Sequence, residues 1–103
     1  MKSLLITGFD PFAHYIVNPS WKAVKALPDV VGDYQLHKLM LPNIFDLEAK
    51  ILLEEAGRVK PDVILLCGMN SGSTRLQLNL AALNIRDAFL EDNLGHRPRG
   101  VPI

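Results

Sequence analysis

The sequence has little of what several protein classes require. It contains one cysteine, Cys67, which excludes an internal disulfide and therefore a disulfide-stabilised scaffold. It has no excess charge of either sign, because eleven basic residues balance eleven acidic ones. A nucleic-acid backbone or an anionic membrane is thus not an expected partner. Its longest apolar run, at residues 63–67, is far shorter than the roughly 20 residues of a membrane-spanning helix. No basic and apolar leader is recognisable, so we expect a cytoplasmic protein.

The remaining features are those of a globular α/β chain. The chain has 103 residues, of which 49% are hydrophobic, so we expect one domain or part of one. Apolar runs at 3–7, 34–41 and 63–67 predict strands, and the last is typical of a central parallel strand buried on both faces. Helices are predicted from Pro19 to Pro28, after an Asn-Pro cap, and over 44–59, where apolar residues recur at helical spacing. This alternation predicts three α/β/α layers around a mostly parallel or mixed sheet.

The last third of the chain has weaker signals. Leu76, Leu78 and Leu80 alternate with polar residues, which predicts a strand that continues to about residue 88. Turn-forming residues dominate from about residue 91, so we expect an irregular tail on a single partial domain that spans residues 1–103.

Ligands of parallel sheets bind beyond the carboxyl ends of the strands, where two loops of this chain are expected. In the first loop, Phe9 and Phe12 flank a stiff Asp-Pro turn. Their rings either stack on a substrate or fold back onto the core, and the sequence favours neither. The second loop, at 68–74, is small and polar enough to offer N–H groups to an anion, although a plain polar turn is the favoured interpretation.

For the cysteine and the histidines, the sequence favours structural roles over catalytic or metal-binding ones. Cys67 closes an apolar strand, where a thiol behaves as a small hydrophobe rather than as a nucleophile. His14, His37 and His96 lack the spacing of a metal cluster, so we expect no metal site. His14 is either a pocket residue or, more commonly for a loop histidine, solvated.

Two polar residues near the predicted last strand are also assigned structural roles. Asn84 and Asp87 are expected to anchor loops by hydrogen bonds to backbone groups.

Four segments carry a resemblance to a known family: TGFDPF at 7–12, NPSW at 18–21, KPDVILLCG at 60–68, and NIRDA at 84–88 followed by Asp92, Asn93 and Gly95. Over essentially its whole length, the chain resembles the N-terminal half of the pyroglutamyl peptidases of peptidase family C15. The resemblance implies a compact α/β/α fold and removal of an N-terminal pyroglutamyl residue from peptides, without a cofactor. It also implies that Phe9 and Phe12 enclose the lactam ring of such a peptide.

The same resemblance implies that the catalytic groups are not in this chain. The family's cysteine and histidine lie in its second half, and Cys67 does not match the nucleophile. Aligned back from Asn84, the family's catalytic glutamate falls on Asn79, its ring-contacting glutamine on Met69, and the arginine of its glycine-rich loop on Ser73. A neutral Asn79 cannot compensate an imidazolium as a carboxylate does, so we expect no hydrolysis of pyroglutamyl peptides.

Three hypotheses follow from this resemblance. The first is a truncated and diverged pseudoenzyme, or the product of an incomplete gene, that keeps the ring-binding loop. The second is a fragment of an active peptidase that is completed by a missing or separate C-terminal half, which the residues Met69, Ser73 and Asn79 argue against. The third is a non-catalytic interaction module with an open sheet edge. Because half of a layered sheet exposes apolar surface, we expect a homo-oligomer or a complex with a partner chain.

Overall fold

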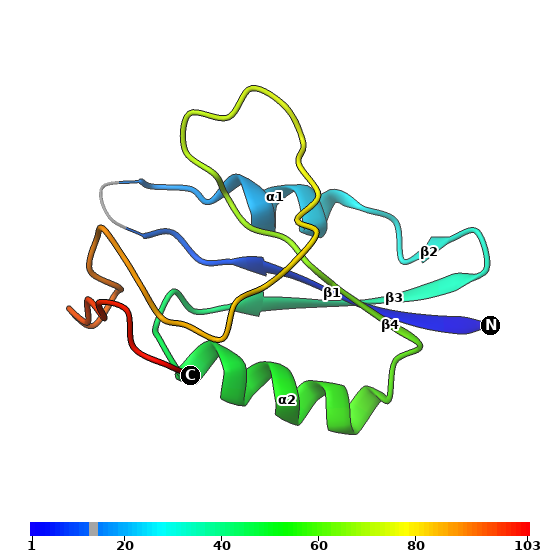
Figure 1. Ribbon diagram of the computed structural model, residues 1–103. Coiled ribbons are helices and arrows are strands. Elements are labelled where there is room, and N and C mark those ends of the chain that lie inside the picture. Colours follow the sequence, from blue (N-terminus) through cyan, green and yellow to red (C-terminus); the bar gives the residue numbers. More distant parts are fainter. Residues whose placement is uncertain (13–14) are drawn as a thin grey trace.

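The computed structural model describes residues 1–12 and 15–103, which contain one four-stranded sheet with a helix on each face (Figure 1). The elements are β1 (Lys2–Phe9), α1 (Pro19–Ala26), β2 (Val30–Val31), β3 (Tyr34–Leu41), α2 (Leu47–Val59) and β4 (Val63–Leu66). The strand order is β2-β3-β1-β4; β1 is parallel to both β3 and β4, and β2 is antiparallel to β3. The α/β/α prediction with a mostly parallel, mixed sheet is therefore confirmed.

The core lies between β1, β3 and α1. Ile6, Val24 and Leu36 form its buried cluster, with one residue from each of these elements. The polar start of α1 also fixes the end of β1. Asn18 caps the helix by accepting a hydrogen bond from the Ser20 N–H at 3.0 Å, and the Ser20 hydroxyl in turn accepts from the Phe9 N–H at 3.0 Å. The helix cap thereby holds the backbone of Phe9 at the carboxyl end of the sheet.

Several boundaries differ from those predicted. The strand at 34–41 is confirmed, but β1 is longer than the predicted 3–7, and α2 begins at Leu47 rather than at residue 44. The backbone of Asp46 has a φ of 72°, which is outside the helical region and delays the helix start. The short strand β2 was not predicted. Its signal is the pair Gly32-Asp33, which forms a tight turn to β3 with Gly32 at a φ of 56°.

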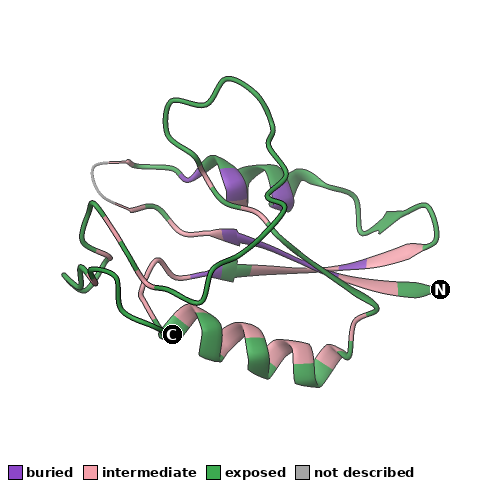
Figure 2. Ribbon diagram, in the orientation of Figure 1, coloured by how far each residue is buried: buried purple, intermediate pink, exposed green. Residues whose placement is uncertain are grey.

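The prediction of β4 as a central strand buried on both faces is wrong for this chain. Val63, Ile64, Leu65 and Leu66 are 42%, 45%, 42% and 58% exposed, and the strand is green throughout in Figure 2. Within the described residues β4 pairs only with β1, so its other edge is open. An apolar run predicts neighbours on both sides, but it does not reveal whether those neighbours belong to the same chain.

The strand predicted from residue 76 to about residue 88 is also wrong. This segment is irregular and contributes only an isolated antiparallel bridge between Arg86 and Val101. Leu76, Leu78 and Leu80 are 102%, 90% and 102% exposed. Alternation produces a strand only where a neighbouring strand or a core buries one face, and the described residues supply neither here. None of the helices described is long and apolar enough to cross a membrane.

Candidate functional site

A cavity of about 390 Å³ lies beyond the carboxyl ends of β1 and β3, which is the edge of the sheet where a ligand is expected. Its walls come from four parts of the chain: the loop after β1, the loop after β3, the first turn of α2 and the segment 88–92. All four phenylalanines of the sequence are among its lining residues: Phe9, Phe12 and Phe45 are half-buried, whereas Phe89 is 91% exposed. The cavity is therefore an aromatic and mostly apolar site with few polar groups.

Phe9 and Phe12, the pair singled out in the sequence, are both half-buried at this cavity. Neither belongs to the core cluster around Ile6. The Phe12 ring contacts Tyr15, with 5.7 Å between ring centroids and 42° between the ring planes. Both rings therefore lie at the cavity and outside the core cluster, and their contact with a ligand stays a prediction.

Asp10 connects the loop after β1 to the loop after β3, and both loops contribute to the cavity lining. One oxygen of its carboxylate accepts hydrogen bonds from the Asn43 backbone N–H at 2.8 Å, the Asn43 side-chain amide at 2.9 Å and the Asn93 side-chain amide at 3.2 Å. Its backbone carbonyl accepts from the Asn18 side chain at 3.1 Å. Since Asp10 lies between the two aromatic residues of the first loop, this network fixes the loop that carries them.

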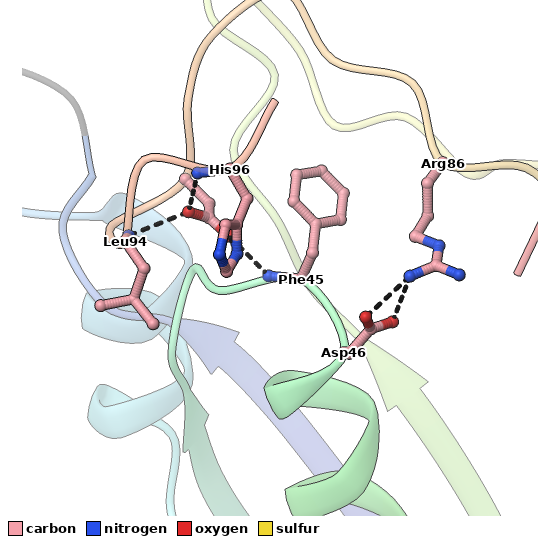
Figure 3. Close-up of polar contacts among 6 residues, drawn as sticks. Phe45, Asp46, Arg86, Leu94 and His96 are labelled. Carbon is pink, nitrogen blue, oxygen red and sulfur yellow. Dashed lines mark hydrogen bonds and ion pairs between the residues drawn. The ribbon is translucent and has the colours of Figure 1, made fainter. Parts of the chain in front are cut away.

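Asp92, another lining residue, is held by the backbone of Phe45, Leu94 and His96, which Figure 3 labels. Its side chain is only 4% exposed and accepts hydrogen bonds from three backbone N–H groups: Phe45 at 2.9 Å, Leu94 at 2.9 Å and His96 at 2.8 Å. The His96 ring nitrogen Nδ1 lies 3.2 Å from the same carboxylate. Burial acts to raise the pKa of Asp92, but the three N–H donors and the nearby His96 ring together outweigh it and hold the pKa below its ordinary value. The ionised carboxylate thus joins the 91–96 turn to the loop after β3.

This pKa shift predicts how the free energy of unfolding changes with pH in the acid range. Because the folded-state pKa of Asp92 lies below its ordinary value of 3.8, its stabilising contribution is present above that pH and is lost as the pH falls through the lower folded-state value. We therefore expect the difference in free energy of unfolding between the wild type and Asp92→Asn to shrink as the pH falls below 3.8. Urea titrations between pH 6 and pH 2.5 measure it, and a difference independent of pH would contradict the assignment.

A second link joins the last segment of the chain to α2. The Arg86 guanidinium donates through Nη1 to both carboxylate oxygens of Asp46, each at 2.7 Å, and through Nη2 to the Pro102 carbonyl at 3.0 Å (Figure 3). Its backbone N–H and carbonyl pair with Val101 at 2.6 and 2.9 Å. Asp46 is largely exposed, so this ion pair contributes modestly to stability, but it places segment 88–92 against the start of α2.

Cys67 lies apart from the cavity lining. Its side chain is half-buried against the core cluster, and its backbone N–H donates to the Thr7 carbonyl at 3.0 Å. Burial raises the pKa of the Cys67 thiol, which lowers the thiolate fraction at neutral pH. This is the structural role predicted from the sequence.

The raised thiol pKa predicts slow alkylation of the folded protein. At pH 8 we expect iodoacetamide to modify Cys67 more slowly than it modifies free cysteine, because the thiolate is the reactive form. The chain has no other cysteine, so the rate reports on this position alone. Unfolding in urea serves as the internal control and is expected to accelerate the reaction, whereas equal rates in the folded and unfolded protein would refute the prediction.

The other site residues expected from the sequence are not brought to the cavity. Met69 is half-buried on the loop after β4, while Ser73 and Asn79 are exposed, and none of the three lines the cavity. Within the 68–74 loop the Ser73 N–H donates to the Asn70 carbonyl at 3.1 Å, as in an ordinary turn. The Ser71 hydroxyl lies 2.9 Å from the Tyr15 hydroxyl, which connects this loop to the first one.

The histidines and the predicted loop anchors have mixed outcomes. His37 is half-buried on β3, His96 contacts Asp92, and His14 falls outside the described residues. Asp87 accepts a hydrogen bond from the Gly100 N–H at 2.9 Å, as expected of a loop anchor. In the part of the chain that the structure describes, no three His, Cys, Asp or Glu side chains are grouped closely enough to hold a metal ion.

Several residues of the site were missed as functional candidates, among them Phe45, Glu48 and Asp92. Phe45 and Glu48 line the cavity, and Asp92 holds its wall. The sequence carries one usable signal for Asp92, because an Asp-Asn pair followed by Gly95 is typical of a turn held by a carboxylate. Periodicity placed Glu48 on the polar face of the predicted helix, and Phe45 carried no signal of its own.

Comparisons with known proteins agree with this geometry. The sequence profile described as "Pyroglutamyl peptidase" matches residues 2–103. The pyrrolidone-carboxylate peptidase of Brevibacillus brevis is 36% identical over 104 aligned positions, covering 100% of this chain and 48% of the relative. That of Brachyspira hyodysenteriae is 38% identical over 94 positions, covering 91% of this chain and 47% of the relative. The chain thus spans about half the length of the curated relatives it matches.

Solved structures give the same result. Pyroglutamyl peptidase I of Bacillus amyloliquefaciens superposes with a TM-score of 0.94 at 34% identity, over 99% of this chain and 50% of that one. Pyrrolidone carboxyl peptidase of Pyrococcus furiosus superposes with a TM-score of 0.84 at 29% identity, over 97% of this chain and 49% of that one. With the profile matched over nearly every residue, the chain belongs to the pyroglutamyl peptidase family and corresponds to the N-terminal half of its members.

Proposed function

We propose that this chain provides the half of a pyroglutamyl peptidase that recognises the pyroglutamyl group, and that the cavity beyond β1 and β3 is where the lactam ring binds. The observation that carries the proposal is the placement of three half-buried phenylalanines, Phe9, Phe12 and Phe45, around this one cavity, at the ligand edge of the sheet. A five-membered lactam is nearly flat, with an amide edge and two faces that aromatic rings can cover, so aromatic walls gain contact area on those faces. The relatives are named for action on this group, which agrees with such a ring.

Phe9 and Phe12 are the principal ring contacts in this proposal. The Ser20 hydroxyl in the first turn of α1 holds the Phe9 backbone, and the Asp10 network holds the turn between the two rings, so both are ordered before a ligand arrives. Such preorganisation lowers the entropic cost of binding. Met69 is proposed to approach the ligand from the loop after β4, because the preceding residue, Gly68, lies beside the Phe9 ring.

Hydrolysis is proposed to need groups that this chain does not supply. Cys67 is not among the cavity-lining residues, and burial raises its thiol pKa, which disfavours it as a nucleophile. Asn79, at the position where the resemblance expects a glutamate, is exposed and away from the cavity. A chain without these groups can bind the ring. It lacks the rate acceleration that a nucleophile and its base provide.

A turnover assay tests this part of the proposal. We expect the purified chain to release fluorophore from a pyroglutamyl-aminomethylcoumarin substrate no faster than buffer does. The Cys67→Ser variant is the matched control, since it removes the only thiol. Turnover by the wild type that disappears in Cys67→Ser would overturn the proposed absence of catalysis.

The open edge of β4 is proposed to bind another polypeptide. Its four residues are 42–58% exposed, and its unpaired edge offers backbone N–H and carbonyl groups. Leu53 on α2, 71% exposed, adds apolar surface on one face of the sheet. Since the relatives are about twice as long, we propose that a polypeptide corresponding to their second half packs here, in a cytoplasmic protein.

Sedimentation measures whether this surface is occupied in solution. We expect the chain at micromolar concentration to associate with itself or with a partner, and Leu65→Lys to weaken that association, because a charge at an apolar interface is costly to desolvate. Lys50→Glu, on the surface of α2, is the control for a change of charge. A wild-type chain that sediments as a stable monomer would contradict the association.

A further inference from the structure

Asn93, in the turn-rich last segment of the chain, contacts both the loop after β1 and the loop after β3, which supply phenylalanines to the cavity. Its side-chain amide donates hydrogen bonds to the Asp10 carboxylate oxygen Oδ1 at 3.2 Å and to the Pro11 carbonyl at 3.1 Å. Its backbone N–H donates to the Asn43 carbonyl at 2.8 Å. Asn93 is exposed and is not among the cavity-lining residues, so its effect on a ligand must act through these contacts.

The bond to Pro11 acts on the peptide unit that leads into Phe12. The proline ring fixes φ of Pro11, and the hydrogen bond to its carbonyl restrains the other backbone torsion, ψ. Because the peptide bond is planar, the same restraint places the Cα of Phe12. Asn43 also binds this loop, but through the carboxylate and the carbonyl of Asp10, one residue earlier. Asn93 therefore holds the point from which the Phe12 ring extends.

The last segment is itself attached to the loop after β3. The Asp92 carboxylate accepts a hydrogen bond from the Phe45 N–H at 2.9 Å, and the bond from the Asn93 N–H to Asn43 lies two residues earlier on the same loop. The Asn93 side chain then reaches across to the loop after β1. The turn at 91–96 thus clasps the two loops, and Asn93 is a residue of this turn that contacts both.

We propose that Asn93 is a positioning residue of the ligand site, which holds the Phe12 ring in the orientation that covers the lactam. This inference rests on the proposed function and adds to it a control of ligand affinity by the last segment of the chain. Without the Asn93 amide, the loop after β1 samples orientations of Phe12 that leave the ligand uncovered. The apparent affinity then falls in proportion to the fraction of molecules that are competent to bind.

Titration of the full chain with pyroglutamyl amide tests this role. Asn93→Ala is expected to fold, because Asn93 is exposed and outside the core cluster, and to bind about 3- to 10-fold more weakly than the wild type. Asn84→Ala is the matched control, since Asn84 is an exposed asparagine in the last third of the chain that does not line the cavity. It should bind as the wild type does. Equal affinities of Asn93→Ala and the wild type would refute the positioning role while the proposed function stands.

A second variant, Asn93→Asp, separates positioning from a merely structural role. It keeps the shape and the backbone N–H, but its carboxylate faces the acceptors on Asp10 and Pro11 without a hydrogen to donate. At pH 7 we expect it to bind at least as weakly as Asn93→Ala. Protonation gives the introduced carboxyl one O–H donor, so its affinity should recover toward that of the wild type as the pH falls to 4.5.

The pH comparison uses the ratio of the two affinities. The other ionisable groups around this position are Asp10 on the loop after β1 and Asp92 and His96 on the same turn. They are present in both proteins, and pyroglutamyl amide carries no ionisable group, so the ratio isolates the introduced carboxyl. A ratio that does not change with pH would contradict the positioning role.

A measurement without ligand decides the case in which no ligand binds. Nuclear relaxation of the backbone amides gives the order parameter of Phe12, which is expected at about 0.85 in the wild type, as for an ordered backbone, and lower in Asn93→Ala. If the wild type does not bind pyroglutamyl amide, the proposed function fails, and this order parameter still tests the link between Asn93 and Phe12. Equal order parameters in the two proteins would refute that link.

Discussion

The Gly8→Ala variant is expected to lose about 3 kcal/mol of the free energy of unfolding, at the upper end of overpacking effects. A methyl group at Gly8 would lie 2.6 Å from both the Cα and the backbone N of Trp21, and 2.9 Å from the carbonyl carbon of Ser20. These are backbone atoms of α1, so no side chain can rotate away. The helix must shift, and Val24, which is 2% exposed in the core, must move with it.

A matched glycine supplies the control. Gly57 lies inside α2, and a methyl group added there would have nothing within 4 Å, so Gly57→Ala is expected to stabilise the protein by about 0.5–1 kcal/mol through helix propensity. Urea denaturation followed by circular dichroism measures both variants. A Gly8→Ala protein as stable as the wild type would show that α1 does not approach β1 as closely as these distances require.

The Phe12→Ala variant is expected to weaken binding of pyroglutamyl amide by about 10- to 100-fold. That range corresponds to removing one aromatic wall, since burial of a phenylalanine side chain is worth about 1.5–3 kcal/mol. Phe12 is half-buried at the cavity and outside the core cluster, so the substitution removes a ligand contact with little effect on the core. Fluorescence or calorimetric titration measures the change in affinity.

Its control is Leu53→Ala, which truncates an apolar side chain on α2 that is 71% exposed and does not line the cavity. We expect Leu53→Ala to bind the ligand as the wild type does. Equal affinities of Phe12→Ala and the wild type would place the binding site elsewhere on the protein.

Local sequence signals predicted the parts of this fold that depend on nearby residues. The Asn18-Pro19 cap placed the start of α1, and the apolar run at 34–41 placed β3, because capping and burial of β3 act over short stretches of chain. The loop with Phe9 and Phe12 was predicted as a candidate ligand loop because a parallel strand ends there, and its ligand binding stays a prediction.

The wrong predictions concern features set by distant partners. The burial of Val63–Leu66 depends on what lies across an open sheet edge, and the leucines at 76–80 have no face to bury among the described residues. The role of Asp92 was hidden because two of its three donors are local but the third, Phe45, is 47 residues away. Glu48 was hidden because a glutamate in the first turn of a helix is favourable for the helix itself, whatever cavity it lines.

The most direct test of ring recognition is a map of where the ligand binds. Titration of the isotope-labelled chain with pyroglutamyl amide, followed by amide chemical shifts, reports on every position with a backbone N–H. We predict saturable shifts that cluster at Phe9, Phe12 and Phe45 and in segment 88–92, with α2 affected at its first turn alone. Absence of shifts at millimolar ligand, or shifts that cluster along β4 instead, would contradict the claim that this half of the fold recognises the pyroglutamyl ring.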